Sequence, residues 1–316
     1  MQIRKLVKSG LSSFVVALPK DFIEKNKLQK GDLIYIEQNS KNELTITTEF
    51  NERSLDKKTK VIECDNVPFS TVKRELTSAY LDNYYEIIIR GKEIPKHIKE
   101  IKSEIAEKVA LEVVDESSEK IVARDFLNYK DTEIIKLIRR IDNIVRSMLI
   151  DMKQAINNKE VFEMIYERDD EVNKLGFLVY RVVKTACINP EIAKTLGIKT
   201  LDIVALWDVN MHLEKMGDES KRVARILSNL DTKKVNPKKI ISIIDLMEEK
   251  YKSTLESFHT KNIALADKVY NERKAIFKQL DDFASKNKDS DVVEIIGKFK
   301  GMMSHLIDIT RLVRYA

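Results

Sequence analysis

Apolar and polar residues follow three successive patterns along the chain, and each pattern predicts a different kind of structure. Over residues 1–50, short runs rich in β-branched and aromatic residues predict four strands, at 3–7, 13–18, 33–37 and 43–48. One amphipathic stretch at 20–26 predicts a short helix, and Pro19 stands at its start, where a missing N–H costs nothing. We therefore expect a small β-rich module at residues 1–50.

Residues 51–127 alternate between short β-rich runs and amphipathic stretches. The β-rich runs predict strands at 60–64, 85–89, 110–114 and 120–123. The amphipathic stretches predict helices at 70–81 and 94–109, which gives the order strand, helix, strand, helix, strand, strand. This segment is expected to be an α/β connecting domain.

From residue 130 to 316 the apolar positions recur at helical spacing. The pattern predicts six long helices, at about 131–157, 160–187, 198–229, 236–260, 262–286 and 290–315. In the third helix one apolar stripe of the kind that faces a core contains Ala205, Val209, Met216, Val223 and Ile226. We predict two antiparallel three-helix units laid side by side, related by a weak internal repeat. The fold class is therefore multi-domain and mainly α.

Length and charge narrow the function classes. A chain of 316 residues suits two or three domains. With 56 basic and 51 acidic residues the net charge is +5, too mild to indicate nucleic acid by itself, so any basic partner surface must be local. No apolar stretch approaches the roughly 18 residues of a membrane span, and the first residues do not resemble a secretory signal. A cytoplasmic protein without membrane insertion is expected.

Catalytic chemistry has no visible candidate in the sequence. Cys64 and Cys187 are far apart and have no Cys or His companion, so both are expected to be buried thiols in a reducing compartment. The four histidines are scattered, and the one-turn spacing of Asp208 and His212 is more typical of a surface hydrogen bond than of a ligand set. Phosphate-binding loops, nucleophile elbows, H-E-x-x-H and dinucleotide motifs are absent. We predict that the protein is not an enzyme.

An ordered set of short motifs marks the first 48 residues: K-S-G at 8–10, S-S-F-V-V-A-L-P-K at 12–20 and K-G-D at 30–32. In this order they resemble the AbrB/SpoVT/MazE family of swapped-hairpin proteins. Four short strands in under fifty residues cannot close a hydrophobic core alone. Two chains that exchange hairpins can, so we expect a homodimer.

The same resemblance implies contact with DNA. In that family, basic side chains of the first strand and its loop touch DNA phosphates, and such binding weakens steeply with salt. The matching residues here, with two serines as further phosphate donors, are Arg4, Lys5, Lys8, Lys20, Ser12 and Ser13. Residues 1–50 hold 8 basic against 6 acidic residues, so a module that serves only as a dimerisation clasp is the alternative.

Two motifs in the helical half, E-R-D-D-E-V-N at 167–173 and the more specific L-E-K-M-G-D at 213–218, resemble the PhoU family of phosphate-uptake regulators. The resemblance covers most of residues 130–316, and a swapped-hairpin module followed by a PhoU bundle is an arrangement known among archaeal proteins. It implies a phosphate-responsive transcriptional regulator that senses through the bundle and acts on DNA. The alternative is an adaptor that acts on a phosphate transporter or a signalling partner, with an N-terminal module that only dimerises.

Four oxygen donors are the candidate metal ligands. Glu214 and Asp218 are one turn apart on one predicted helix, and Asp169 and Asn173 repeat this spacing on the helix before it. Where such helices pack together the donors converge, which suits iron, zinc, magnesium or another oxygen-liganded cation. The helical projection places Glu214 and Asp218 opposite the apolar stripe, so a solvated, salt-bridged acidic face is the alternative.

The second three-helix unit departs from the family pattern. Arg273 and Phe277 stand where the acidic residues of the fifth helix would be repeated. In the sixth helix Ser304 replaces one acid, and only Asp308 is kept. We therefore expect a single metal cluster or none.

Overall fold

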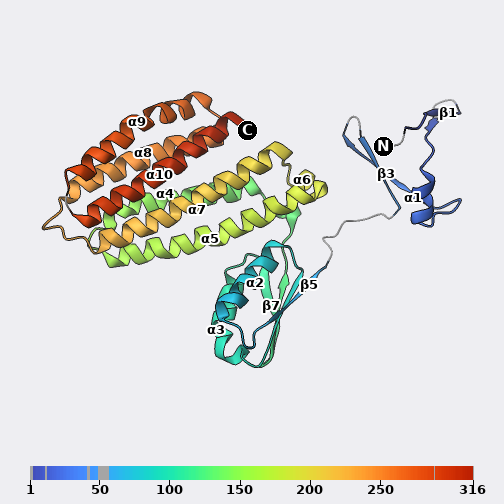
Figure 1. Ribbon diagram of the computed structural model, residues 1–316, viewed down its shortest axis with the longest axis horizontal. Coiled ribbons are helices and arrows are strands. Elements are labelled where there is room, and N and C mark those ends of the chain that lie inside the picture. Colours follow the sequence, from blue (N-terminus) through green and yellow to red (C-terminus); the bar gives the residue numbers. More distant parts are fainter. Residues whose placement is uncertain (1–2, 11–12, 41–42, 49–56, 288, 316) are drawn as a thin grey trace. The chain divides into compact units, whose positions relative to one another are not determined.

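The computed structural model describes residues 3–10, 13–40, 43–48, 57–287 and 289–315. It divides the chain into two compact units, residues 1–56 and residues 57–316. The predicted fold class is confirmed, because the chain is mainly helical, with a small β-rich part near the N-terminus and a long helical bundle (Figure 1). No helix within the described residues has the length and apolar character needed to span a membrane.

Within the N-terminal unit the described residues form two antiparallel hairpins and one short helix: β1 (Val7–Ser9) with β2 (Ser13–Val15), α1 (Lys20–Lys25), and β3 (Tyr35–Ser40) with β4 (Glu43–Thr47). The first two strands are shorter than predicted, because their ladder of backbone hydrogen bonds covers only three residues on each side. No described side chain of this unit is buried. Its exposed large apolar residues are Ile3, Leu6, Val7, Phe14, Val15, Val16, Leu33, Ile34, Tyr35, Ile36 and Leu44.

The α/β domain has the predicted element order. Its elements are β5 (Thr59–Glu63), α2 (Phe69–Leu81), β6 (Glu86–Arg90), α3 (Ile94–Ala106), β7 (Leu111–Glu116) and β8 (Lys120–Asp125). The sheet order is β5-β6-β8-β7, in which β5 runs parallel to β6 and β8 runs antiparallel to both of its neighbours. Apolar side chains of the sheet, among them Ile62, Ile87 and Ile121, are buried against Leu76 of α2 and Ile101 of α3. This domain closes a core of its own.

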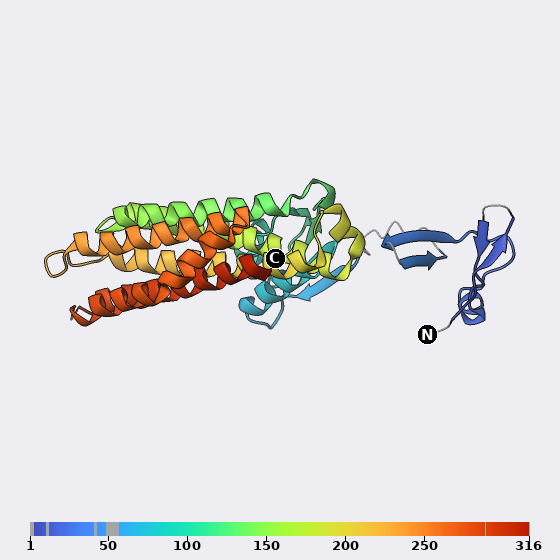
Figure 2. The same ribbon diagram turned by 90° about the horizontal axis from the view of Figure 1, so that it is seen from above.

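Six long helices form the bundle. The first three-helix unit consists of α4 (Ile134–Asp151), α5 (Lys159–Ile188) and α7 (Thr200–Ser228), and the second of α8 (Pro237–Thr260), α9 (Ile263–Ser285) and α10 (Ser290–Tyr315). Between the two units α7 packs against α10 and α4 against α8. Figure 2 shows these helices lying alongside one another.

Asparagine side chains cap the starts of four helices. The oxygens of Asn158, Asn189, Asn236 and Asn262 accept backbone N–H groups at the starts of α5, the short α6 (Pro190–Thr195), α8 and α9. The helix predicted at 131–157 is shorter, because η1 (Tyr129–Asp131) precedes α4 and α4 gives way to the 3-10 turn η2 (Met152–Ala155).

The apolar stripe predicted for α7 faces the core. Ala205, Val209, Met216 and Val223 are buried, and Ile226 is half-buried. The expectation of two buried thiols is wrong for one of them, because Cys64 is buried in the α/β domain but a thiol near the end of α5 is exposed, that of Cys187.

Candidate functional site

A buried arginine of α5 joins the α/β domain to the bundle. The Arg181 side chain is 1% exposed, and its Nη1 and Nη2 donate to the two carboxylate oxygens of Asp125 on β8 at 2.9 and 2.6 Å. Its Nε donates to Oδ1 of Asn83 at 2.6 Å, and the Tyr129 hydroxyl donates to the same oxygen at 2.7 Å. The guanidinium carbon lies 4.5 Å from the ring centroid of Tyr80. A neutralised and hydrogen-bonded charge therefore holds this joint.

Nearer the start of α5, a second ionic group links α5 to α7. Asp169 of α5 has a fully buried side chain that accepts a hydrogen bond from the Lys221 ammonium of α7. Lys221 also lies 3.3 Å from Asp218, three residues earlier on its own helix. The amide of Asn173 donates to Oδ2 of Asp169 at 3.3 Å. We call Asp169, Asn173, Asp218 and Lys221 the Asp169 cluster.

Burial and pairing act against each other within the Asp169 cluster. Burial raises the pKa of the Asp169 carboxyl, and Lys221 acts to lower it again. Burial also disfavours the Lys221 ammonium, but its hydrogen bond to Asp169 together with the negative charges of Asp169 and Asp218 outweighs that cost and raises the pKa of Lys221. Lys221 therefore stays charged and is the counter-ion of Asp169.

The predicted metal ligands are only partly brought together. Asp169, Asn173 and Asp218 meet in the cluster, whereas Glu214 is half-buried and forms its ion pair with Lys215 at 3.7 Å. Oδ1 of Asp169 is buried without a hydrogen-bond partner among the described residues, which favours a further cation. Against this, Lys221 already supplies the charge, and no three His, Cys, Asp or Glu side chains of the described residues gather as metal ligands would. As they lie, these residues hold a lysine, and the metal site stays a prediction.

The second three-helix unit repeats the geometry of the Asp169 cluster with one change of charge. On α7 and α10, Asp218 with Lys221 and Asp308 with Arg311 are ion pairs of the same spacing, at 3.3 and 2.6 Å. Each cation also lies near a tyrosine of the neighbouring helix, and in the first unit this tyrosine stands three residues before Asp169. Lys221 Nζ is 5.5 Å from the ring centroid of Tyr166, and the Arg311 guanidinium carbon is 5.9 Å from that of Tyr270. The equivalent of Asp169 is therefore Arg273.

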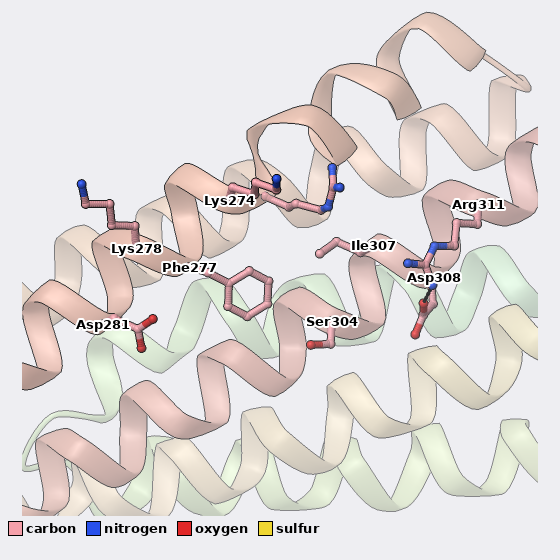
Figure 3. A pocket seen from close by; sticks show the side chains of 9 residues that line it. Lys274, Phe277, Lys278, Asp281, Ser304, Ile307, Asp308 and Arg311 are labelled. Atoms are coloured by element: carbon pink, nitrogen blue, oxygen red, sulfur yellow. Dashed lines mark hydrogen bonds and ion pairs between the residues drawn. The ribbon is translucent and has the colours of Figure 1, made fainter.

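Arg273 lines a groove on the surface between α9 and α10. The groove has a volume of about 530 Å³ and contains Arg273, Lys274, Phe277, Lys278, Asp281, Ser304, Ile307, Asp308 and Arg311 (Figure 3). The Arg273 guanidinium does not form an ion pair among the described residues. It donates to the backbone carbonyl of Tyr270 at 2.7 Å and lies 3.7 Å from that ring's centroid. We call this surface the basic groove.

Two of the scattered histidines meet between the two three-helix units. Nδ1 of His212 on α7 lies 3.2 Å from Nδ1 of His305 on α10, while His212 Nε2 lies 3.5 Å from Asp208. Burial and the neighbouring His212 lower the pKa of His305. The Asp208 contact follows the predicted one-turn spacing, but the contact between histidines on separate helices had no signal in the sequence.

The predicted DNA-contacting residues lie on the surface of the N-terminal unit. Those that the structure describes are all exposed: Arg4, Lys5, Lys8, Ser13 and Lys20. Ser12 lies outside the described residues. Lys8 and Ser13 share the first hairpin, where Lys8 is opposite Phe14, and Lys20 begins α1 with an ion pair to Glu24 at 3.3 Å. DNA contact stays a prediction.

The fold and these sites define a helical-bundle protein with internal ion pairs and an open basic groove. Residues 138–227 match the family model of the PhoU domain, which places the likeness on α4 to α7, the first three-helix unit. Among solved structures, PhoU from Pseudomonas aeruginosa is similar, with 16% sequence identity and a TM-score of 0.47 over 58% of this chain and 94% of that one. No curated protein matches the chain.

Proposed function

We propose that this protein is a non-enzymatic regulator of phosphate homeostasis that works as an adaptor on a phosphate transporter or its signalling partner. The observation that carries the proposal is the PhoU-domain match over residues 138–227, the region that holds the Asp169 cluster. The resemblance of the L-E-K-M-G-D motif to the phosphate-uptake regulators supports the phosphate link. The long exposed faces of the bundle suit a protein that acts by contact.

The test is phosphate uptake in cells that lack the gene. Uptake of radioactive phosphate should lose its normal response to phosphate-rich medium, and a plasmid with the wild-type gene should restore the response. A plasmid carrying Lys221→Met should restore it less well, because that change removes the counter-ion of buried Asp169. Uptake that responds normally without the gene would contradict the proposal.

The N-terminal unit supports a dimeric adaptor. Its large apolar side chains are exposed; Phe14 and Ile36, for example, are each 60% exposed. Exposed apolar residues crowded on short hairpins favour association, because burial contributes about 25 cal/mol per Å². We propose that two chains pair through these hairpins, as the swapped-hairpin resemblance implies. Light scattering should give the mass of two chains for the wild type and of one for Phe14→Asp/Ile36→Asp; a monomeric wild type would remove this part.

Transcriptional control through DNA is the second candidate function. The exposed cations of the first hairpin and α1 favour it, since Lys5 and Lys8 form no ion pair among the described residues. In a gel-shift assay with DNA from upstream of phosphate-transport genes, Lys5→Glu/Lys8→Glu/Lys20→Glu should abolish a salt-sensitive shift. A wild type that shifts no DNA would leave the adaptor function alone.

A cation beside Asp169 is a further proposal, supported by the buried Oδ1 that lacks a partner among the described residues. Elemental analysis of the purified wild type beside Asp169→Ala and Glu214→Ala tests it. Equal metal content in the three proteins would remove it.

A further inference from the structure

The basic groove has an excess of positive charge that the described residues do not neutralise. Its two acids are already paired, Asp308 with Arg311 at 2.6 Å and Asp281 with Lys300 at 2.7 Å. Lys274 and Lys278 are exposed and have no acidic partner among the described residues. With Arg273, three cations are therefore left without a counter-charge.

The floor of the basic groove is apolar. Phe277 is half-buried and stands at the position equivalent to Asn173 of the first three-helix unit. Figure 3 shows its ring in the space between α9 and α10, with Lys278 pointing away from that space at the rim. Ile307 of α10 lines the same groove and is 6% exposed. An apolar centre with a charged rim is the usual anatomy of a protein interface.

We infer that the basic groove docks an acidic segment of a partner protein, with one apolar side chain of that segment over Phe277 and Ile307. Charge complementarity carries this choice, because three unneutralised cations favour a negatively charged partner and reject a basic one. Inorganic phosphate suits the groove less well, since a small anion has no use for the Phe277 ring. The inference rests on the proposed adaptor function and adds where the partner binds and what its chemistry is.

The test uses the full-length protein and a fluorescein-labelled twelve-residue peptide of alternating Glu and Asp with one central Leu. Fluorescence anisotropy should show saturable binding that weakens as salt is added. Lys274→Glu/Lys278→Glu should weaken binding by roughly tenfold, because two attractive charges at the rim of the groove become repulsive towards an acidic peptide. Phe277→Ala should weaken binding of the Leu peptide but leave binding of the same peptide with Ser in place of Leu unchanged.

The matched control is Lys238→Glu/Lys239→Glu at the start of α8. It changes the net charge by the same amount, both residues are exposed, and neither lines the groove. Binding by this variant should stay within about twofold of the wild type. Thermal melting of each variant excludes loss of fold as the cause of weaker binding.

Several results would overturn the inference. Equal weakening by the control pair would show that net charge alone attracts the peptide. Full displacement of the peptide by millimolar inorganic phosphate at constant ionic strength would indicate a small-anion site. Self-association that Lys274→Glu/Lys278→Glu abolishes would make a second copy of this chain the occupant.

The two proposals fail separately. A Lys274→Glu/Lys278→Glu gene that restores regulated phosphate uptake as well as the wild type would overturn the docking site and leave the adaptor function standing. Phosphate uptake that ignores loss of the gene would remove the adaptor function, while peptide binding would still test the groove.

Discussion

In the first three-helix unit the Asp169 carboxylate is fully buried and faces Lys221, whereas in the second unit the equivalent residue, Arg273, is half-buried and shares the Tyr270 ring with another cation, Arg311. The tyrosine near each cation and the ion pair along the last helix are shared by the two units. Lys221 of the first unit thus forms an internal ion pair with Asp169, whereas Arg311 of the second unit, which has Arg273 at the equivalent position, lines an open groove. The two units share these contacts, but the side chains at the equivalent positions of Asp169 and Arg273 differ in charge.

The middle helices of the two units also differ in what they carry. α5 holds the α/β domain through Arg181, whereas α9 lines the basic groove through Arg273. Residues that join domains are buried and neutralised in the first unit. Charged residues of the second unit's groove remain available to a partner. The comparison assigns structural work to these residues of the first unit, and the proposed docking site lies on the second.

Loss of the domain joint should have the largest effect on stability. Arg181→Met leaves the Asp125 carboxylate, 12% exposed, without its counter-ion. Breaking a buried pair from one side costs about 4 kcal/mol of unfolding free energy. Urea denaturation followed by circular dichroism measures the change. The matched control is Lys184→Met, one turn along α5, which removes a pair with Asp82 whose side chains are 37% and 44% exposed.

Because exposed pairs contribute little, Lys184→Met should cost under about 1 kcal/mol. Arg181→Met/Asp125→Leu should recover part of the loss, since neither charge then remains buried. Equal effects of the two single changes would show that burial of the Arg181 pair is not what holds the joint.

The Asp169 cluster gives the next largest effect and tests the comparison directly. Lys221→Met should lower the unfolding free energy by about 3 kcal/mol, because the buried Asp169 carboxylate loses its counter-ion. The equivalent change in the second unit, Arg311→Met, should cost under about 1 kcal/mol, since Arg311 and Asp308 are largely exposed. Urea denaturation of both variants provides the measurement.

Lowering the pH should reduce the difference in unfolding free energy between Lys221→Met and Arg311→Met. Without Lys221 the Asp169 carboxyl titrates at higher pH, so protonation removes the unpaired charge as the pH falls. A Lys221→Met variant as stable as Arg311→Met at neutral pH would mean that the two units do not differ in the way their contacts indicate.

Packing beside the cluster gives a smaller effect. Gly217 of α7 is equivalent to Ile307 of α10, and a Cβ at Gly217 would lie 3.4 Å from Oδ1 of Asp169 and from Cγ1 of Val172. Gly217→Ile should therefore cost about 2 kcal/mol through overpacking, measured by thermal melting. The control is Gly301→Ile on α10, where a Cβ meets nothing within 4 Å. A tolerated Gly217→Ile would show that the first unit has room for the second unit's side chain.

Sequence periodicity was sufficient for the fold but not for the chemistry of the sites. The six long helices follow from apolar spacing and asparagine breaks, both of which are local signals. The spacing of Asp169 and Asn173 predicted that polar groups converge. It missed Lys221, although this residue is one turn from Asp218, because helix spacing does not tell which side chain crosses to the neighbouring helix.

Contacts between distant segments had no signal in a single sequence. Arg181 and Asp125 lie in separate domains, and nothing in the helical spacing distinguishes Arg181 from a surface position of a long helix. In the N-terminal unit the opposite holds, because its length predicted that four short strands cannot close a core alone, and no described side chain of the unit is buried. That a segment is too short to form a hydrophobic core can be inferred from its length alone. A buried ion pair between distant segments can be recognised only once the fold is known.

The histidine pair at the seam between the two units gives the smallest effect and responds to pH. His305 is held below its ordinary pKa by burial and by His212, with Lys215 acting in the same direction and Asp308 and Glu219 acting against it. The unfolded chain therefore binds more protons just below the ordinary histidine pKa of about 6.5, so stability is highest above that pH and falls as the pH drops. Thermal melting between neutral pH and about pH 5 should show a steeper loss for the wild type than for His305→Gln. His97→Gln, in α3 of the α/β domain, is the control and should follow the wild type. If His305→Gln and the wild type lose stability in parallel, protonation of His305 does not act on the contact between the two units.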